Sequence, residues 1–281
     1  MALLVAGAFF MEMLDATIIG PAIPRIAESL RVDPVDVNVA ISAYLVTVAV
    51  LIPASGWIAD RLGPRRVFLT AIAVFTVASV GCAASTSLPM LVAMRVLQGV
   101  GGAMMVPVGR LAVLRSSDKS DLVRAIALLT WPALLAPVIA PAIGGAITTF
   151  WSWQWIFVAN IPIGIAGFVL SLKLFRGDPG LDSTSLDWRG LTVLGAAIAA
   201  ALIALEGIRV TGTDWPYVVI GAAGATILFV VATIHLRRSP HPLVDLRVLR
   251  TPTLRISVSA GALYRLVITA VPFLLALQFQ L

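Results

Sequence analysis

The stretch GWIADRLGPRRVFL, residues 56–69, gathers four charged side chains in a chain in which only 12% of the residues are charged. Apolar sequence runs on both sides of it, and the 23 residues from Val37 to Ala59 contain no charge at all. A helix of that length crosses a hydrocarbon core about 30 Å thick. The stretch is therefore predicted to be a short polar loop between two membrane-spanning helices.

The composition of the whole chain agrees with a membrane environment. Of its 281 residues, 59% are hydrophobic, whereas soluble domains are about 45–50% apolar and about 25% charged. So much apolar surface cannot be buried in one soluble core, so lipid is the expected solvent. A single cysteine, Cys82, excludes an internal disulfide and a cysteine-based zinc site.

Uncharged runs and polar breaks divide the chain into helices. The 48 uncharged residues from Ala125 to Leu172 would form a helix of about 72 Å, too long for one crossing, so a turn is expected at FWSWQW (150–155). A similar break is expected at STSLP (85–89). A ninth helix is predicted from about residue 255 to the end, after eight spans near 2–24, 37–59, 67–84, 88–110, 124–149, 155–174, 188–208 and 215–235.

The basic residues predict how these spans are oriented. Fourteen of the 20 Lys and Arg residues fall in loops that follow even-numbered spans, and only Arg25, Arg31 and Arg209 lie on the opposite side. Basic residues accumulate in cytoplasmic loops, which predicts a cytoplasmic N-terminus. The net charge of +6 is thereby distributed as topology requires, which argues against a nucleic-acid-binding face.

Ionisable residues inside predicted spans are candidates for function, because burying them in lipid is costly. Glu12 and Asp15 are three residues apart and share one face of the first helix. By helix rise, Asp15 and Arg95 in the fourth span lie at a similar depth, so we expect them to pair. A purely structural lock between two helices is the alternative to a functional site. Other ionisable residues within spans are Arg110, Glu206 and Arg265.

The opening stretch resembles the loop between spans two and three of the major facilitator superfamily, whose pattern is G-x-L-A-D-R-x-G-R-K-x-x-L. Pro64 departs from this pattern where a basic residue is usual, and the matching residues are Gly56, Asp60, Arg61, Gly63 and Arg65. In that family the loop acts as a conformational latch. The resemblance implies that Asp60 and Arg65 form the latch contacts here, with support from Arg61 and Arg66. The two glycines suit close packing and a tight turn.

Three more segments resemble motifs of the same family. LVAMRVLQGVGGA (91–103) resembles the fourth-span motif through Arg95, Gln98, Gly99 and Gly101. LDATIIGPAIP (14–24) resembles the first-span motif that contains Asp15.

The third segment, APVIAPAIGG (136–145), resembles the antiporter motif of the fifth span, with two Ala in place of its leading Gly. The residues that match are Pro141, Gly144 and Gly145, which are expected to bend the helix and make it thin at the bend. In the family this motif shapes a barrier against leak.

WSWQWIFVANIPIG (151–164) and LDWRG (186–190) resemble the drug:proton antiporters with fourteen spans. The resemblance implies an all-α polytopic protein whose missing C-terminal half is expected in the full-length chain. The expected parts are a six-helix N-terminal bundle, a cytoplasmic linker, two inserted helices, a basic cytoplasmic loop and the first helix of an incomplete second bundle, at 1–176, 177–187, 188–236, 237–255 and 256–281.

The expected function is proton-coupled efflux of hydrophobic or cationic compounds across a bacterial cytoplasmic membrane by alternating access. Asp15 is the expected proton carrier, with Glu12 as the second candidate and Arg95 as the modulating cation. The candidate substrate contacts are Glu12, Tyr44 and Trp131, with packing or an interfacial anchor as the alternative for Trp131. The alternatives are a metabolite importer or symporter of the same fold and a truncated membrane protein that does not transport. No catalytic, metal-binding or cofactor-binding pattern is evident in the sequence, and the only histidines are His235 and His241.

Overall fold

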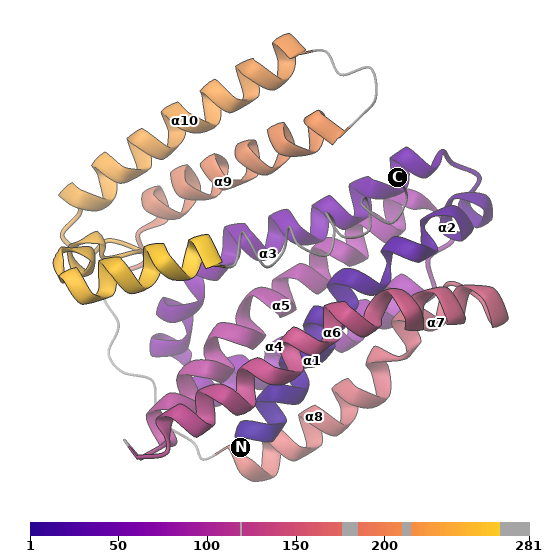
Figure 1. Ribbon diagram of the computed structural model, residues 1–281, viewed down its shortest axis with the longest axis horizontal. Coiled ribbons are helices and arrows are strands. Elements are labelled where there is room, and N and C mark those ends of the chain that lie inside the picture. Colours follow the sequence, from indigo (N-terminus) through magenta and orange to yellow (C-terminus); the bar gives the residue numbers. More distant parts are fainter. Residues whose placement is uncertain (119, 176–184, 210–214, 265–281) are drawn as a thin grey trace.

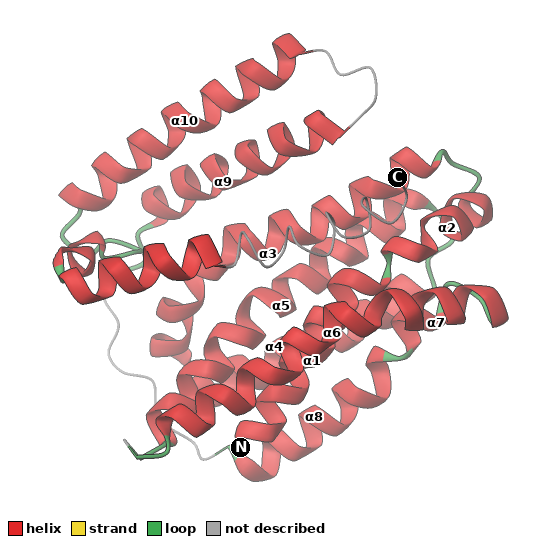
Figure 2. Ribbon diagram, in the orientation of Figure 1, coloured by secondary structure: helices red, strands yellow, loops and turns green. Residues whose placement is uncertain are grey.

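The computed structural model describes residues 1–118, 120–175, 185–209 and 215–264. The described residues form helices and connecting loops, with no strand among them (Figure 2). In chain order the helices are α1 (Ala2–Ile18), α2 (Ile23–Leu30), α3 (Pro34–Leu62), α4 (Pro64–Ala83), α5 (Leu88–Ser116), α6 (Leu122–Phe150), α7 (Trp155–Val158), α8 (Asn160–Leu174), α9 (Trp188–Arg209) and α10 (Trp215–Arg238).

Eight of the described segments are long and apolar enough to cross a membrane. The first combines α1 and α2 over Ala2–Leu30, and the sixth combines α7 and α8 over Trp155–Leu174. Each of the eight predicted spans overlaps one of these segments, and the two breaks expected within long apolar runs fall at 84–87 and 151–154. Most of the predicted ninth helix, from residue 265 on, lies outside the described residues. The described part of this region is helical over 252–264.

The helix ends follow local sequence rules. Several helices have Pro in their first turn, where its missing N–H costs no hydrogen bond, among them α2, α3, α4 and α5. Gly63 separates α3 from α4 with a φ of 83°, a conformation that strains residues with a side chain. The tight turn expected at Gly63 is therefore present, and it holds the charges of the opening stretch at one end of the bundle.

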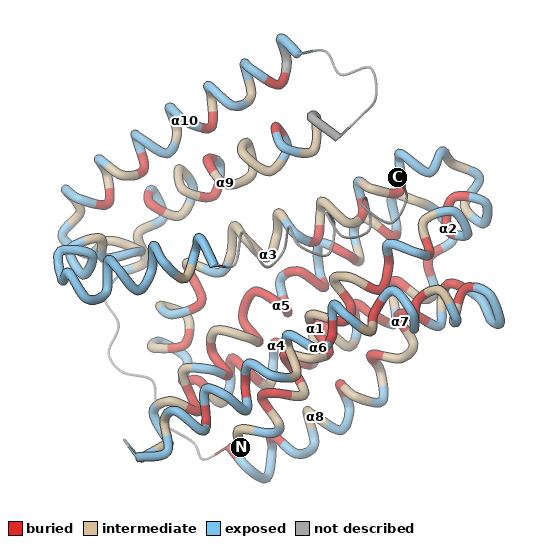
Figure 3. Tube along the Cα trace, in the orientation of Figure 1, coloured by how far each residue is buried: buried red, intermediate tan, exposed pale blue. Residues whose placement is uncertain are grey.

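The core lies around α1 and α5, whose residues are the most deeply buried (Figure 3). α5 packs against α3 on one side and against α4 on the other, and α1 packs against α6 and α8. Gly99 and Gly101 permit these approaches, since an added Cβ would lie 2.8 Å from Thr47 of α3 or 2.8 Å from backbone atoms of α4. The glycines of the fourth span thus serve two helix contacts, one with α3 and one with α4.

The helices α9 and α10 form an antiparallel hairpin beside α3 (Figure 1). α9 makes the contact with α3, and a Cβ added at Gly195 would lie 2.8 Å from Val50. α10 packs on α9 and leaves much of its surface exposed. The hairpin is therefore attached to the six-helix bundle along the outer face of α3.

Candidate functional site

The deepest polar contact in the bundle joins α1 to α5. Arg95 Nη1 donates to Asp15 Oδ2 at 2.5 Å, and both side chains have no exposed surface. The structure thus pairs Asp15 with Arg95, as expected from their similar depths in the first and fourth spans. An ion pair removed from water in this way is costly unless its remaining polar atoms are also satisfied.

Neutral side chains from three further positions complete the environment of Asp15. Its Oδ1 accepts from Gln98 Nε2 at 2.9 Å and from Asn160 Nδ2 at 2.6 Å. Gln98 also accepts from Arg95 Nη1 at 2.8 Å and donates to Ser79 Oγ at 2.9 Å. Asp15 is therefore held by α1, α5 and α8 together, with α4 attached through Ser79.

Gln98 belongs to a motif recognised in the sequence but had no predicted role, and neither Asn160 nor Ser79 was predicted to take part. Asn160 could have been found, because a buried amide within the apolar run of 155–174 needs a hydrogen-bond partner. Ser79 offered no such signal, since its hydroxyl also bonds the carbonyl of Phe75 within its own helix.

Aromatic rings cover the guanidinium group of Arg95. Its Cζ lies 4.1 Å from the ring centroid of Tyr44 and 5.9 Å from that of Phe157. Such contacts stabilise a cation that has lost its water. Tyr44 is buried at 1% exposure, whereas Trp131, the other candidate substrate contact, is 74% exposed on α6.

Glu12 lies on the same face of α1 as Asp15 and is buried at 4% exposure. Its Oε2 has no hydrogen-bond partner among the described residues. Glu12 thus adds a second buried carboxyl group to a site that contains one guanidinium group.

The charges of the opening stretch lie at the end of the bundle that carries the α3–α4 turn and the last turns of α5 and α8, which we call the basic end. Asp60 accepts from Arg115 Nη2 at 3.0 Å, and both side chains are about two-fifths exposed. Arg65 donates instead to the carbonyl of Leu172 at 3.0 Å, and Arg61 lies over the ring of Trp57. The partner of Asp60 in this structure is therefore Arg115, which the sequence did not predict, and not Arg65.

The three glycines singled out in the α3 and α6 motifs are not packed alike. At Gly56 an added Cβ would meet no atom within 4 Å, so the close packing expected there is absent among the described residues. In the fifth-span motif, a Cβ at Gly144 would lie 2.5 Å from the carbonyl oxygen of Ile18, whereas one at Gly145 would meet nothing within 4 Å. α6 is assigned as one continuous helix with Pro141 inside it.

A second polar junction lies at the basic end, where the hairpin starts and finishes. Asp187 precedes α9 and accepts from the backbone N–H of Gly190 at 2.8 Å and of Leu243 at 3.4 Å. His235 Nε2, in the last turn of α10, lies 2.8 Å from the same carboxyl group. Burial acts to raise the pKa of Asp187, but these hydrogen bonds outweigh it and hold the pKa below its usual value.

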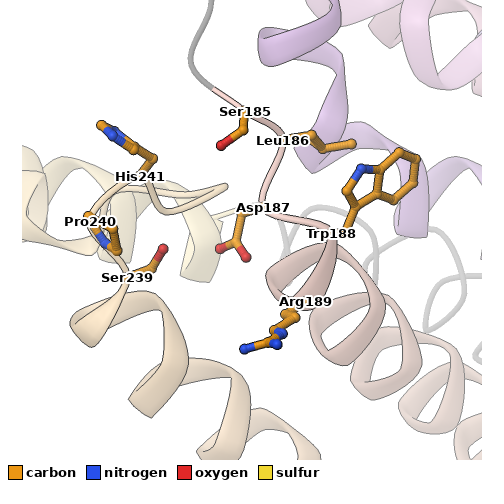
Figure 4. Close-up of a pocket in the computed structure, with 8 residues that line it drawn as sticks. All are labelled: Ser185, Leu186, Asp187, Trp188, Arg189, Ser239, Pro240 and His241. Carbon is orange, nitrogen blue, oxygen red and sulfur yellow. The ribbon is translucent and has the colours of Figure 1, made fainter.

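A shallow cavity of about 300 Å³ opens beside this junction (Figure 4). It is lined by the loop before α9 and the loop after α10, and an adjoining cavity reaches Trp57 of α3. Asp187, the best buried polar group here, is already fully engaged by the contacts above. Among the described residues, no group of three or more His, Cys, Asp or Glu side chains is arranged to hold a metal ion.

Among the described residues, eight apolar segments are long enough to cross a membrane, and a buried ion pair joins two of them, which defines a multi-pass membrane protein with a polar site inside its spans. The chain belongs to the Major Facilitator Superfamily, whose profile it matches over residues 5–281.

Curated relatives are consistent with this membership. The chain is 40% identical to the "Putative multidrug resistance protein MdtD" of Cronobacter sakazakii and 38% identical to the protein of the same name in Salmonella paratyphi A. Each alignment covers 99% of this chain but 59% of the relative, so the chain spans less than two thirds of their length.

Solved structures share the fold at low sequence identity. The crystal structure of the POT family transporter PepTSo has a TM-score of 0.55 at 15% identity, covering 87% of this chain and 55% of that chain. A bacterial homologue of the human lysosomal transporter Spinster, inward-facing and unoccupied, has a TM-score of 0.51 at 17% identity, covering 85% of this chain and 63% of that chain. The expected all-helical fold is confirmed.

Proposed function

We propose that this chain belongs to a proton-coupled exporter of hydrophobic, often cationic compounds. The observation that carries the proposal is the fully buried pair of Asp15 and Arg95, placed within two spans. An intramembrane acid beside a cation is suited to binding and releasing protons, because either change alters the balance of a charged, water-free site. The names of the curated relatives support drug compounds as the class of substrate.

The hydrogen bonds of Asp15 indicate how a proton would act. Oδ1 accepts from two neutral amides, while Oδ2 accepts from Arg95. A proton on Oδ2 would face the N–H of Arg95, and two donors cannot share that contact. Protonation therefore releases Arg95 from Asp15 while Gln98 and Asn160 keep the carboxyl group in place, and the loss of the proton restores the pair.

The latch is part of the same proposal. Asp60, Arg61 and Arg65 occupy the basic end, which we assign to the cytoplasmic side of a bacterial inner membrane, with the N-terminus on that side. In the full-length protein a second bundle would face this end, and the pair of Asp60 with Arg115 would open and close as the two bundles rock. The fourteen-span plan and the five-part division of the chain are proposed on the same resemblance.

The experiment is antiport in vesicles that contain the full-length protein. An imposed proton gradient should drive accumulation of tetraphenylphosphonium, a hydrophobic monovalent cation, and Asp15→Asn should abolish it. Glu28→Gln is the matched control, because that acid is 73% exposed and pairs with Arg25 on the surface. Equal accumulation by the wild type and Asp15→Asn would overturn the assignment of Asp15, and growth on a nutrient in place of efflux would favour an importer.

A further inference from the structure

Four buried polar atoms near the Asp15–Arg95 pair have no hydrogen-bond partner among the described residues. They are Glu12 Oε2, Tyr44 Oη, Arg95 Nε and Arg95 Nη2. Their residues are 4%, 1% and 0% exposed, so solvent at the surface does not satisfy them. Buried polar groups are almost always hydrogen-bonded, and several unsatisfied ones in one place indicate a bound polar species.

Two of these residues, Glu12 and Tyr44, lie beside Gly102 of α5. A Cβ at Gly102 would lie 3.3 Å from Tyr44 Oη, 3.5 Å from Glu12 Cδ and 3.5 Å from Val48. The missing side chain therefore leaves a methyl-sized space that Glu12 and Tyr44 both border. Arg95 adjoins it, because its guanidinium group stacks on the ring of the same tyrosine.

The charges of this cluster do not balance as they stand. Asp15 and Glu12 are two carboxyl groups, and Arg95 is the cation that they share. The ionisable residues of the helices packed against α1 are otherwise at or toward the basic end, namely Arg110 and Arg115 of α5, Arg124 of α6 and Lys173 of α8. An unpaired buried carboxylate is very costly, so one of the two acids must carry a proton for the cluster to be neutral.

We propose that Glu12 and Asp15 share one proton, with Arg95 as the common cation, and that water beside Gly102 links Glu12 to Tyr44 and Arg95. Water fits because it donates to Glu12 and accepts from the unpaired N–H groups of Arg95. A drug-sized compound does not fit a space this enclosed, and a metal ion would be repelled by the guanidinium group. In the paired state Asp15 is ionised and Glu12 holds the shared proton, and transfer of this proton to Asp15 leaves Arg95 to face an ionised Glu12. When a cationic substrate binds, its charge replaces that of the proton, which leaves to the solvent while Asp15 pairs with Arg95 again.

This inference rests on the proposed function, and proton release separates the two. In weakly buffered detergent, tetraphenylphosphonium should release about one proton from the full-length wild type, the amount expected of one coupled pair of acids. Glu12→Gln should abolish the release while it still binds the cation, because Asp15 and Arg95 then form a neutral pair with no shared proton. If Asp15 alone carries the proton, Glu12→Gln releases as much as the wild type, and the inference is overturned.

Milder variants test the water. Gly102→Ala fills the space without displacing backbone, and Tyr44→Phe removes the hydroxyl while it keeps the ring on Arg95. Each should slow release about tenfold, as expected when a hydrogen bond to a charged group is lost. Gly7→Ala on α1 is the control, since a Cβ there meets nothing within 4 Å. Unchanged rates in both variants would overturn the water-linked site, whereas a wild type without proton release would remove the proposed function itself.

Discussion

Asn160 donates a hydrogen bond of 2.6 Å to Asp15 although 145 residues separate them in the chain. The bond places the start of α8 against the last turn of α1 and fixes the carboxyl oxygen that does not contact Arg95. Asp15 is therefore held in position by neutral groups, whether or not the ion pair is intact. In the proposed mechanism, that independence would let Arg95 leave and return without unfolding the site.

The ion pair should be costly to break from one side and cheaper to replace as a whole. Arg95→Met leaves Asp15 charged and buried, and we expect a loss of about 3–5 kcal/mol in the free energy of unfolding. The double variant Asp15→Leu with Arg95→Met should recover most of that loss, because no buried charge remains. Thermal unfolding in detergent measures both, and additive losses in the double variant would show that the two residues are not coupled.

The two glycines of the fifth-span motif should respond differently to alanine. Gly144→Ala places a methyl group 2.5 Å from the backbone of Ile18, so α6 and α1 must move apart at a cost of about 1–3 kcal/mol. Gly145→Ala meets open space and should leave stability unchanged or raise it by about 0.5–1 kcal/mol. Denaturation of both variants in one detergent tests this, and equal losses would mean that close packing at Gly144 is not what the motif provides.

The pair of Asp60 and Arg115 should matter for transport more than for stability. Both side chains are substantially exposed, so removing the pair should change the free energy of unfolding by about 1 kcal/mol or less. Asp60→Arg should nevertheless impair efflux, and Arg115→Asp in the same protein should restore part of it. Efflux of a fluorescent hydrophobic cation from cells reports both variants, and a double variant as impaired as the single one would exclude Arg115 as the partner.

Asp187 should make the hairpin junction sensitive to acid. Because its pKa is lowered in the folded protein, its ionised form contributes stability above its ordinary value of about 3.9, and that contribution is lost as the pH falls below it. Asp187→Asn keeps an acceptor for the N–H of Gly190 but has no charge to lose. The wild type should therefore exceed the variant in Tm near neutral pH, and the difference should shrink toward about pH 3. A difference that does not change with pH would contradict the role of the charge.

The sequence predicted the eight spans because charge, Trp and Pro mark where apolar runs must end, and these signals are local. The pairing of Asp15 with Arg95 could also be predicted, since helix rise alone gives similar depths. The partners of Asp60 and Arg65 could not be predicted, because they depend on which helix ends meet at the basic end. Gly56 shows the same limit: a glycine in a motif predicts close packing only once its neighbour is known.

The most direct test of the proton site is the protonation state of Asp15 when substrate binds. Infrared difference spectra of the full-length protein, recorded on addition of tetraphenylphosphonium, report the carbonyl stretch of protonated carboxyl groups. The site predicts a change in that band that disappears in both Asp15→Asn and Glu12→Gln and persists in Glu28→Gln. A band that is unchanged in Asp15→Asn would contradict the proposal that Asp15 and Arg95 couple proton movement to substrate.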